Sequence, residues 1–235
     1  MNNVGSAARG WSIGLLVAVS LPLAGCTNVV SGAALRDQNA VSANVPPLNE
    51  SRLRDVMLSI DELNSIVGSS SMANALDSDD MSQTSVTVSD PDCLGTLFGA
   101  EQQVYGDDWT AVRDQVFREP GDDKEHWVEQ TVVVYPSEMK AQKFFADSVA
   151  VWERCGGFSV AIDDDGFDYT WQLDAATVEG DYLIQLGTQE DSGGWECQHA
   201  LTALSNVTVE TWACAFGIKD EAAEMARRII ENVAK

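Results

Sequence analysis

Four cysteines spread over residues 93–214 constrain this fold more than any other sequence feature. They are Cys93, Cys155, Cys197 and Cys214. None belongs to a C-x-x-C motif and the chain has only two histidines, so a structural zinc site explains them poorly. In an exported chain, an even number of cysteines indicates two disulfides, with three possible pairings. Whether these four cysteines form disulfides therefore depends on whether the chain is exported.

The N-terminus indicates export. Arg9 precedes an apolar run over residues 14–21, and Leu23-Ala24-Gly25-Cys26 follows. The run is shorter than the roughly 20 residues of a transmembrane helix. A basic start, a short apolar core and small residues before a cysteine resemble a bacterial lipoprotein signal peptide. That resemblance implies cleavage of residues 1–25 and lipidation of Cys26 by diacylglycerol and palmitate-type acyl chains. The alternative is an uncleaved N-terminal anchor.

The charge of the mature chain excludes several classes of partner. Residues 1–25 contain one basic residue, Arg9, and no acidic residue, so 37 acidic and 13 basic side chains remain and the formal charge is -24. Such a chain repels nucleic acids and anionic lipid head groups. We interpret the acidic surface as a source of solubility.

The mature chain divides into a tether and one globular domain. Residues 26–50 are rich in Ser, Ala, Asn and Val and contain Pro46-Pro47, which indicates a flexible tether. Residues 51–235 are long enough for one domain with a full core, and seven Trp and seven Phe supply its apolar area. We expect an α+β domain with a twisted antiparallel sheet of about six strands.

Hydrophobic periodicity predicts most elements of this domain. Ser59 and Glu62 have the spacing of a capping box, which predicts a helix that ends at Gly68. The other predicted helices are a short one after Pro91, a long one over 137–155 and a final one from Asp220. Strands are predicted over 84–89, 109–118, 127–135, 169–173, 175–179, 182–188, 196–204 and 207–216. Residues 69–83 lack a period and are predicted to be a loop.

The last two predicted strands suggest one disulfide pairing. A two-residue turn at Ser205-Asn206 would place Leu204 opposite Val207 and, further along, Cys197 opposite Cys214. Facing residues at a non-hydrogen-bonded position lie within disulfide reach. Cys93 would then pair with Cys155. Loop entropy predicts stabilisation by roughly 3 kcal/mol for the hairpin disulfide and roughly 4 kcal/mol for the longer loop.

The sequence offers few groups for nucleophilic catalysis. It contains no G-x-S-x-G motif, and its domain cysteines are expected to be oxidised. His126 stands beside Trp127, and His199 would face Trp212 in the proposed hairpin. We interpret both histidines as packed or hydrogen-bonded groups beside aromatic rings.

Acidic residues offer a second kind of chemistry. The clusters at 163–168 and 77–80 lack the spacing of a calcium loop, so we interpret them as solvated turns. Paired carboxylates on one sheet face could hydrolyse glycosides, and the candidates are Asp114, Glu119, Glu125 and Glu129. Large aromatic side chains either fill the core or line an apolar cleft; they include Trp109, Phe117, Trp127, Trp171, Tyr182 and Trp212.

Several segments together resemble a known family. They are residues 58–68 (LSIDELNSIVG), 89–95 (SDPDCLG), 109–113 (WTAVR), 118–122 (REPGD), 126–130 (HWVEQ) and 194–201 (GWECQHAL). The chain resembles the PknH-like extracellular sensor domain of mycobacteria and their relatives, which occurs fused to membrane kinases and as free-standing lipoproteins. The resemblance implies an α/β fold with a twisted antiparallel sheet, flanking helices, two disulfides and a large cleft.

The resemblance supplies no catalytic residue, so we expect a non-enzymatic protein without metal or cofactor. Our leading hypothesis is a lipid-anchored domain on the extracytoplasmic side of the cell membrane that binds a small-molecule or lipid ligand in its cleft, through residues that the sequence does not identify. One alternative is a module that docks an envelope partner such as a receptor kinase ectodomain. A carboxylate-dependent hydrolase is the third hypothesis.

Overall fold

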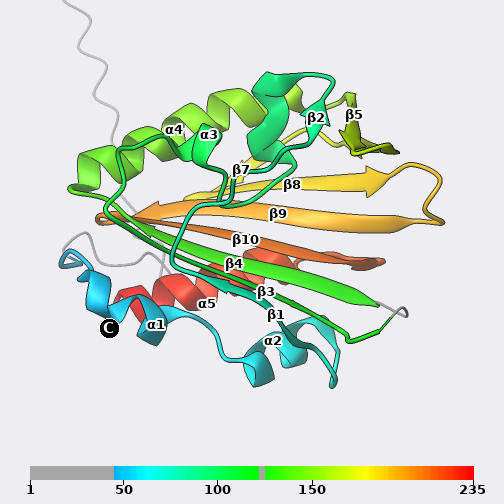
Figure 1. Cartoon of the computed structure of the whole chain (residues 1–235). Coiled ribbons are helices and arrows are strands. Elements are labelled where there is room, and N and C mark those ends of the chain that lie inside the picture. The colour runs from blue at the N-terminus through cyan, green and yellow to red at the C-terminus, as the bar shows by residue number, and fades with distance from the viewer. Residues whose placement is uncertain (1–44, 122–124) are drawn as a thin grey trace, which may run out of the picture. The chain divides into compact units, whose positions relative to one another are not determined.

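The computed structural model describes residues 45–121 and 125–235 (Figure 1). The predicted signal peptide, most of the tether and Cys26 lie outside these residues. Among the described helices, none combines the length and the apolar character that a membrane span requires.

The described chain is built around one antiparallel sheet of ten strands, more than the six expected. The strand order is β1-β3-β4-β10-β9-β8-β6-β5-β2, and β7 pairs with β8 beside this path. The strands are β1 (Ala73–Ser78), β2 (Thr87–Val88), β3 (Ala111–Arg118), β4 (His126–Val134), β5 (Ser159–Asp164), β6 (Phe167–Leu173), β7 (Thr177–Glu179), β8 (Tyr182–Gln189), β9 (Trp195–Leu204) and β10 (Val207–Phe216).

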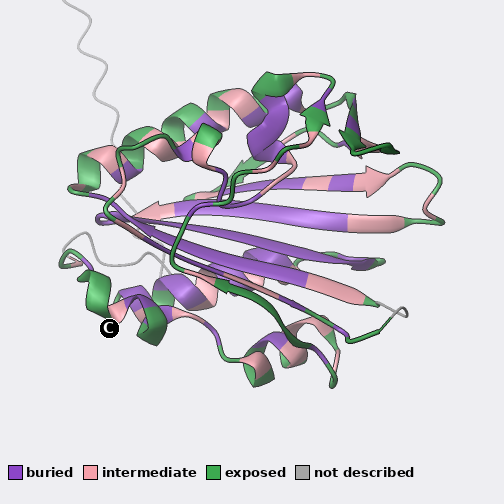
Figure 2. Cartoon of the chain, viewed as in Figure 1, coloured by how far each residue is buried: buried purple, intermediate pink, exposed green. Residues whose placement is uncertain are grey.

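Helices cover both faces of the sheet (Figure 1). They are the 3₁₀ helices η1 (Glu50–Arg52) and η2 (Pro91–Thr96) and the α-helices α1 (Leu53–Val56), α2 (Ile60–Val67), α3 (Gln102–Tyr105), α4 (Glu138–Cys155) and α5 (Glu221–Val233). One face carries α4 together with η2 and α3, and the other carries α5, α1 and α2. The central strands are consequently buried on both sides (Figure 2).

The face beneath α5 holds the main hydrophobic core. Val128 and Val132 of β4 and Val209 and Ala213 of β10 point to this face and are buried. They pack against the apolar stripe of α5, whose buried residues are Ala222, Ala223, Met225, Ala226, Ile229, Ile230 and Val233. Because side chains alternate along a strand, the intervening residues of β4 and β10 point to the opposite face, toward α4.

The β9–β10 hairpin has the predicted register. Its turn is Ser205-Asn206, Leu204 lies opposite Val207, and Cys197 lies opposite Cys214. The two cysteines form a disulfide with their Cα atoms 4.0 Å apart. The second disulfide joins Cys93 to Cys155, as predicted, and ties η2 to the end of α4.

Helix boundaries agree with the sequence analysis. Ser59 and Glu62 form the predicted capping box, and Gly68 ends α2 in the left-handed conformation with φ of +79°. The segment after Pro91 is the 3₁₀ helix η2. The long helix and the final helix start after Ser137 and Asp220, the predicted positions, although neither side chain forms a capping hydrogen bond.

Two strands were missed by the sequence analysis. Residues 69–83, predicted to be a loop, contain β1, an edge strand paired with β3. Its residues are almost all exposed, so it has no alternating apolar pattern. Strand β5 presents only two buried side chains, Val160 and Ile162, which is too short a pattern to predict a strand. The predicted strand over 84–89 is shortened to β2.

The folded region reaches further toward the N-terminus than residue 51. Leu48 is buried, and its N–H donates to Asn206 Oδ1 at 2.7 Å. Asn206 Nδ2 donates to the carbonyl oxygens of Leu48 and Tyr135 at 3.2 and 3.1 Å. One buried amide at the hairpin turn therefore holds the incoming chain against the sheet.

We expect Asn206→Ala to destabilise the domain by about 3 kcal/mol, because it leaves three buried backbone groups without their partner. Denaturant unfolding at neutral pH measures the change. Asn74→Ala is the matched control, since Asn74 is exposed and bonds only to Leu76 O of its own strand. A loss for Asn206→Ala as small as that of the control would contradict this role.

Candidate functional site

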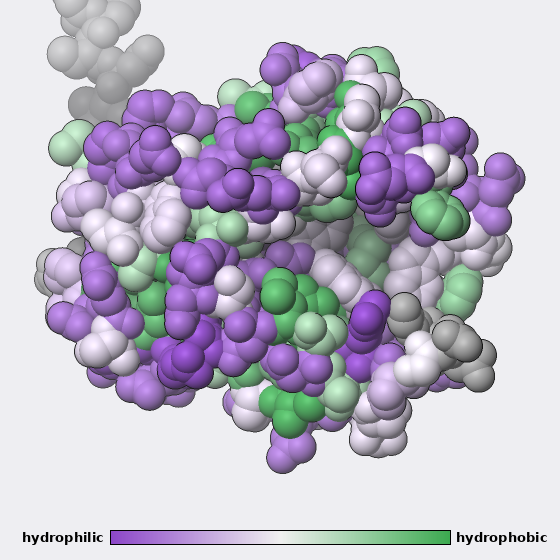
Figure 3. Space-filling model, in the orientation of Figure 1, coloured by the Kyte–Doolittle hydropathy of each residue, from purple (hydrophilic) through white to green (hydrophobic). Residues whose placement is uncertain are grey.

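A cleft of about 460 Å³ opens on the α4 side of the sheet, and Figure 3 shows this side of the molecule hollowed. Four half-buried aromatic side chains stand along it: Trp127, Tyr169, Trp171 and Trp195. Residues 97–99, which follow η2, form another wall, and Leu76, Val116 and Arg118 lie on the β1–β3 side. The cleft is therefore largely apolar and aromatic, as ligand-binding clefts usually are.

Strand register builds the floor of this cleft. Trp212 of β10 lies directly between Glu129 of β4 and His199 of β9. The next row toward the cleft mouth places Cys214 between Trp127 and Cys197. All of these side chains point to the same face because cross-strand neighbours share a face.

Carboxyl groups gather at this floor. Asp114 and Glu129 line the cleft, and both are buried. Asp114 accepts a hydrogen bond from Thr131 Oγ1 at 2.7 Å and one from the Glu129 carboxyl. Burial raises the pKa of Glu129 well above its usual range, and the charges of Asp114 and Glu210 raise it further. Burial also raises the pKa of Asp114, although the hydrogen bonds from Thr131 and Glu129 oppose it. Asp114 and Glu129 are thus a pair of neighbouring buried carboxyl groups whose pKa values are both raised.

Two further acids lie beside this pair. Burial raises the pKa of Glu101, which lines the cleft and accepts a hydrogen bond from the N–H of Thr84 at 3.2 Å. Glu210 accepts hydrogen bonds from Tyr105 Oη at 2.7 Å and from the N–H of Ala100 at 3.2 Å. Four acidic side chains from different elements therefore converge on one part of the sheet.

His199 is the basic group nearest to these acids. Its ring lies between Trp152 and Trp212, with centroid distances of 3.9 and 3.8 Å. Its Nε2 bonds to Glu210 Oε1 at 2.8 Å. Burial lowers the pKa of His199, although Glu210 opposes the shift, so the ring is neutral at pH 7. The histidine is a packed and hydrogen-bonded group beside aromatic rings, as the sequence analysis proposed.

The wall at residues 99–101 is pressed closely against the floor. A Cβ atom on Gly99 would lie 2.6 Å from Glu129 Oε1, so only glycine permits this approach. Ala100 is fully buried and has φ of +51°, a left-handed conformation that costs a non-glycine residue energy. Hydrogen bonds hold it there, since its N–H donates to Glu210 and its carbonyl accepts from the N–H of Ser82 at 2.8 Å.

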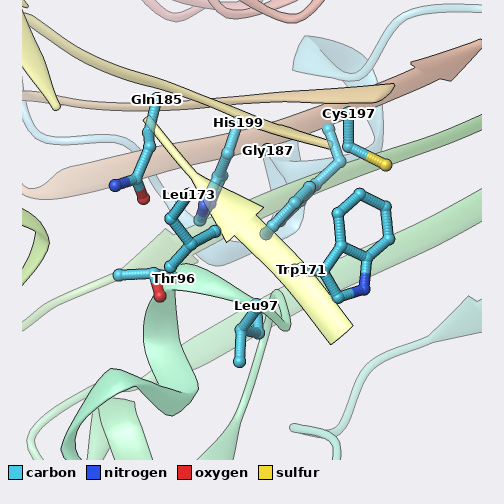
Figure 4. A pocket seen from close by; sticks show the side chains of 9 residues that line it. Thr96, Leu97, Trp171, Leu173, Gln185, Gly187, Cys197 and His199 are labelled. Carbon is cyan, nitrogen blue, oxygen red and sulfur yellow. The ribbon is translucent and has the colours of Figure 1, made fainter. Parts of the chain in front are cut away.

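A smaller cavity of about 10 Å³ adjoins the cleft (Figure 4). Gln185 and His199 lie at one side of it and Thr96 at another (Figure 4). Trp171 and Cys197 line both this cavity and the cleft. A space of this size matches one water molecule and excludes any organic ligand. This cavity is therefore no ligand site. A groove of about 570 Å³ between η2 and α4 lacks the buried carboxyl groups and the row of tryptophans, so the cleft of about 460 Å³ is the candidate binding site.

The two disulfides brace the cleft from opposite sides. Cys197–Cys214 crosses the floor between β9 and β10. Cys93–Cys155 fixes η2, from which the wall at residues 97–99 continues, to α4. Covalent links on the floor and behind the wall limit the conformations in which the cleft can collapse.

The structure separates the acidic residues that the sequence grouped on one sheet face. Asp114 and Glu129 meet in the cleft, whereas Glu125 is exposed before β4. Glu119 bonds to Ser69 Oγ at 2.7 Å and to His126 Nδ1 at 2.8 Å. Burial opposes ionisation of Glu119, but the hydrogen bonds of Ser69 and His126 outweigh it and lower the pKa to about 2. Glu119 is a hydrogen-bond partner of Ser69 and His126 outside the cleft.

The acidic clusters at 77–80 and 163–168 also lie outside the cleft. Asp77 and Asp79 pair with the buried guanidinium of Arg113. Residues 163–168 span the ends of β5 and β6 and the turn between them, where Asp165 and Gly166 have positive φ. The expected lipidation site Cys26 is outside the described residues.

Sequence reasoning missed Glu101, Tyr105 and Glu210. Glu210 had a detectable signal, because it is the only charged residue between Val207 and Phe216, a strand that is otherwise apolar or weakly polar. An acidic side chain inside a strand buried on both faces requires a partner or a function. Glu101 and Tyr105 had no such signal, since short irregular segments carry them.

Comparisons with known proteins agree with this architecture. The family described as "PknH-like extracellular domain" matches residues 48–232. The chain is 38% identical over 192 residues to the serine/threonine-protein kinase PknH of Mycobacterium bovis, which covers 80% of this chain and 32% of that protein. PknH of Mycobacterium tuberculosis is also 38% identical and is covered to 30%. The chain thus spans about a third of the length of these curated relatives.

A solved structure extends the likeness to three dimensions. The crystal structure of the extracellular domain of PknH from Mycobacterium tuberculosis matches with a TM-score of 0.78 and 35% identity. The match covers 80% of this chain and 98% of that domain.

The raised pKa of Glu129 predicts how stability depends on pH. A carboxyl group whose pKa is higher in the folded state stabilises the fold below its unfolded value, here near 4.5, and loses that contribution as pH rises. We expect Glu129→Gln, which cannot ionise, to flatten this decline and to exceed the wild type in unfolding free energy at pH 8 by at least about 1 kcal/mol.

Urea unfolding at a series of pH values measures this effect. Glu153→Gln on the exposed side of α4 changes the net charge equally and should leave the curve unchanged. Parallel curves for the wild type and Glu129→Gln would show that Glu129 ionises in the native state as freely as in the unfolded chain.

Proposed function

The chain belongs to the PknH-like extracellular domain family, and on this premise we propose that it is a non-enzymatic, sensor-type domain that binds a small ligand in its cleft. The observation that carries this proposal is the cleft itself. It combines about 460 Å³ of space, aromatic walls and a polar floor of buried carboxyl groups. Burying carboxyl groups costs folding free energy, and a concave space that keeps them is typical of a binding site.

We further propose that acyl chains on Cys26 hold the domain on the extracytoplasmic side of the cell membrane. The motif Leu23-Ala24-Gly25-Cys26 supports this placement, and so does the family, which is described as an extracellular domain. The two disulfides also support it, because disulfides persist in an oxidising compartment. In this arrangement residues 1–25 are the signal peptide and the rest of the predicted tether joins the anchor to the folded domain.

A pair of carboxyl groups is also what a glycoside hydrolase requires, but the separation of Asp114 and Glu129 is unfavourable for hydrolysis. Glycosidases place their two carboxyl groups about 5 Å or more apart, so that a sugar or a water fits between them. Asp114 and Glu129 are hydrogen-bonded to each other, and that contact leaves no room for a reacting bond. Their close contact therefore supports ligand recognition more than hydrolysis.

The binding proposal predicts that one cleft tryptophan matters and one outside it does not. We expect a thermal-shift screen against envelope lipids, glycans and small amphiphiles to find a saturable ligand, which at a hundredfold excess over its Kd stabilises the domain by about 2.7 kcal/mol. Trp127→Ala should weaken that ligand about tenfold or more, because it removes a wall of the cleft.

Trp109→Ala is the matched control, since Trp109 lies outside the cleft and donates to Gly106 O at 2.9 Å. A ligand that binds both variants equally would sit elsewhere on the molecule. A broad panel without any response would favour the docking of a protein partner.

The anchor proposal predicts the mass of the mature protein. In membranes of a lipoprotein-processing bacterium, we expect the chain to begin at Cys26 and to carry acyl groups, whereas Cys26→Ser should leave the protein unprocessed and unlipidated. Mass spectrometry of the detergent extract measures both. A wild-type chain that still carries Met1 would refute the proposal.

A further inference from the structure

We propose that the ligand of this cleft carries a cationic amine, which binds the carboxyl pair of Asp114 and Glu129, and an apolar or aromatic body, which packs against the tryptophan walls. This inference rests on the proposed binding function and specifies the chemical class of its ligand.

The first step is the charge of the cleft floor. Within residues 45–121 and 125–235, no lysine or arginine forms an ion pair with Asp114, Glu129, Glu101 or Glu210. Arg113 belongs to the other face of β3, where Asp77 and Asp79 pair with it. The floor is therefore acidic without a cation of its own.

The remaining basic groups near the floor do not neutralise it. His199 bonds to Glu210, and burial keeps its ring neutral. Arg118 is exposed at the cleft mouth, where water screens its charge. A buried carboxylate without a counter-charge is costly, so a cation that enters the cleft gains the attraction that the protein does not supply.

The second step is an unpaired donor on a residue that lines the same cleft. Trp212 is 7% exposed and lines the cleft, and its indole N–H is buried without a hydrogen-bond partner among the described residues. Buried indole N–H groups normally find an acceptor. An amine with a neighbouring oxygen, as in amino alcohols and amino sugars, would engage both the carboxyl pair and this N–H.

The third step is the shape and chemistry of the walls. Trp127, Trp171 and Trp195 are half-buried and offer aromatic surface along the cleft. Indole faces attract cations as well as apolar groups, and they do so more strongly when water is excluded. An anionic ligand would meet the acids without a compensating cation, and a neutral ligand would leave their charge unpaired.

Amine binding is linked to proton release. The pKa values of Glu129 and Asp114 are both raised, and the charged groups that face Glu129 are Glu210 and Glu101, with His199 bound to Glu210. An ammonium group favours the fully ionised pair and displaces a proton bound to it to solvent. Affinity for an amine should therefore rise with pH, in the direction opposite to the stability of the unliganded fold.

The test uses three probes that share one body and differ in charge: 4-phenylbutylamine, 4-phenylbutan-1-ol and 4-phenylbutanoate. Titration calorimetry of the folded domain at pH 7 should show the amine binding about tenfold or more tightly than the alcohol, with no detectable binding of the carboxylate. The amine should release protons, measured as a difference in heat between phosphate and Tris buffers.

Variants separate the carboxyl pair from the general acidity of the protein. Glu129→Gln and Asp114→Asn should each reduce the preference for the amine to about threefold or less and abolish proton release. Glu153→Gln, with the same change in net charge, should alter neither. Thermal melts of each variant confirm that it is folded.

The outcomes distinguish this inference from the function on which it rests. If the amine and the alcohol bind equally well, the ligand class proposed here is wrong. If Trp127→Ala still weakens both, the cleft remains the binding site. An amine preference that survives both carboxyl variants would also overturn the inference. No binding of any of the three probes would count against the cleft as a binding site and the amine inference alike.

Discussion

The structure depends on the unbroken register of β10 between β4 and β9. This strand is covered on both faces, so alternate residues serve two environments. Val209, Thr211 and Ala213 face the core beneath α5, while Glu210, Trp212 and Cys214 face the α4 side, where Trp212 and Cys214 line the cleft. A shift of one residue would turn Glu210 into the hydrophobic core and Val209 toward α4. The disulfide between Cys197 and Cys214 fixes this register covalently. The register of β10 therefore determines both the hydrophobic core and the cleft floor.

The cleft collects the features that a fold optimised for stability alone would lack. Its floor has buried acids with raised pKa values, Ala100 between the cleft-lining residues Gly99 and Glu101 has a left-handed conformation, and Gly99 lies against the carboxyl group of Glu129. Each feature costs free energy, and each borders the same space. Elsewhere local preference and structure agree, as in the capping box of α2 and the apolar stripe of α5. Such a contrast is typical of a site that the rest of the fold supports.

Much of this fold could be predicted from the sequence, because strong periods and turn chemistry mark its central elements. The hairpin of β9 and β10, the helices α2, α4 and α5 and the pairing of Cys197 with Cys214 all follow from local patterns. The edge strand β1 could not be predicted, since exposed strands lack an apolar alternation. The site was partly foreseen: Asp114 and Glu129 were candidates, but Glu101 and Glu210 reach them only through the packing of a distant loop and a third strand. Convergence of that kind is a property of the assembled sheet.

The amide of Asn206 has a consequence for how the domain is held. It binds Leu48 at the turn that ends β9, whereas the row toward the cleft mouth lies around Cys197, seven residues and about 23 Å from Leu204 along the same strand. Leu48 is consequently held at the end of the hairpin remote from the cleft mouth. A mechanical pull applied at Leu48 would be carried first by the turn and then lengthwise along the strands. The attachment at Leu48 and the mouth of the cleft thus lie at opposite ends of the β9–β10 hairpin. A force on the attachment therefore does not act directly across the cleft.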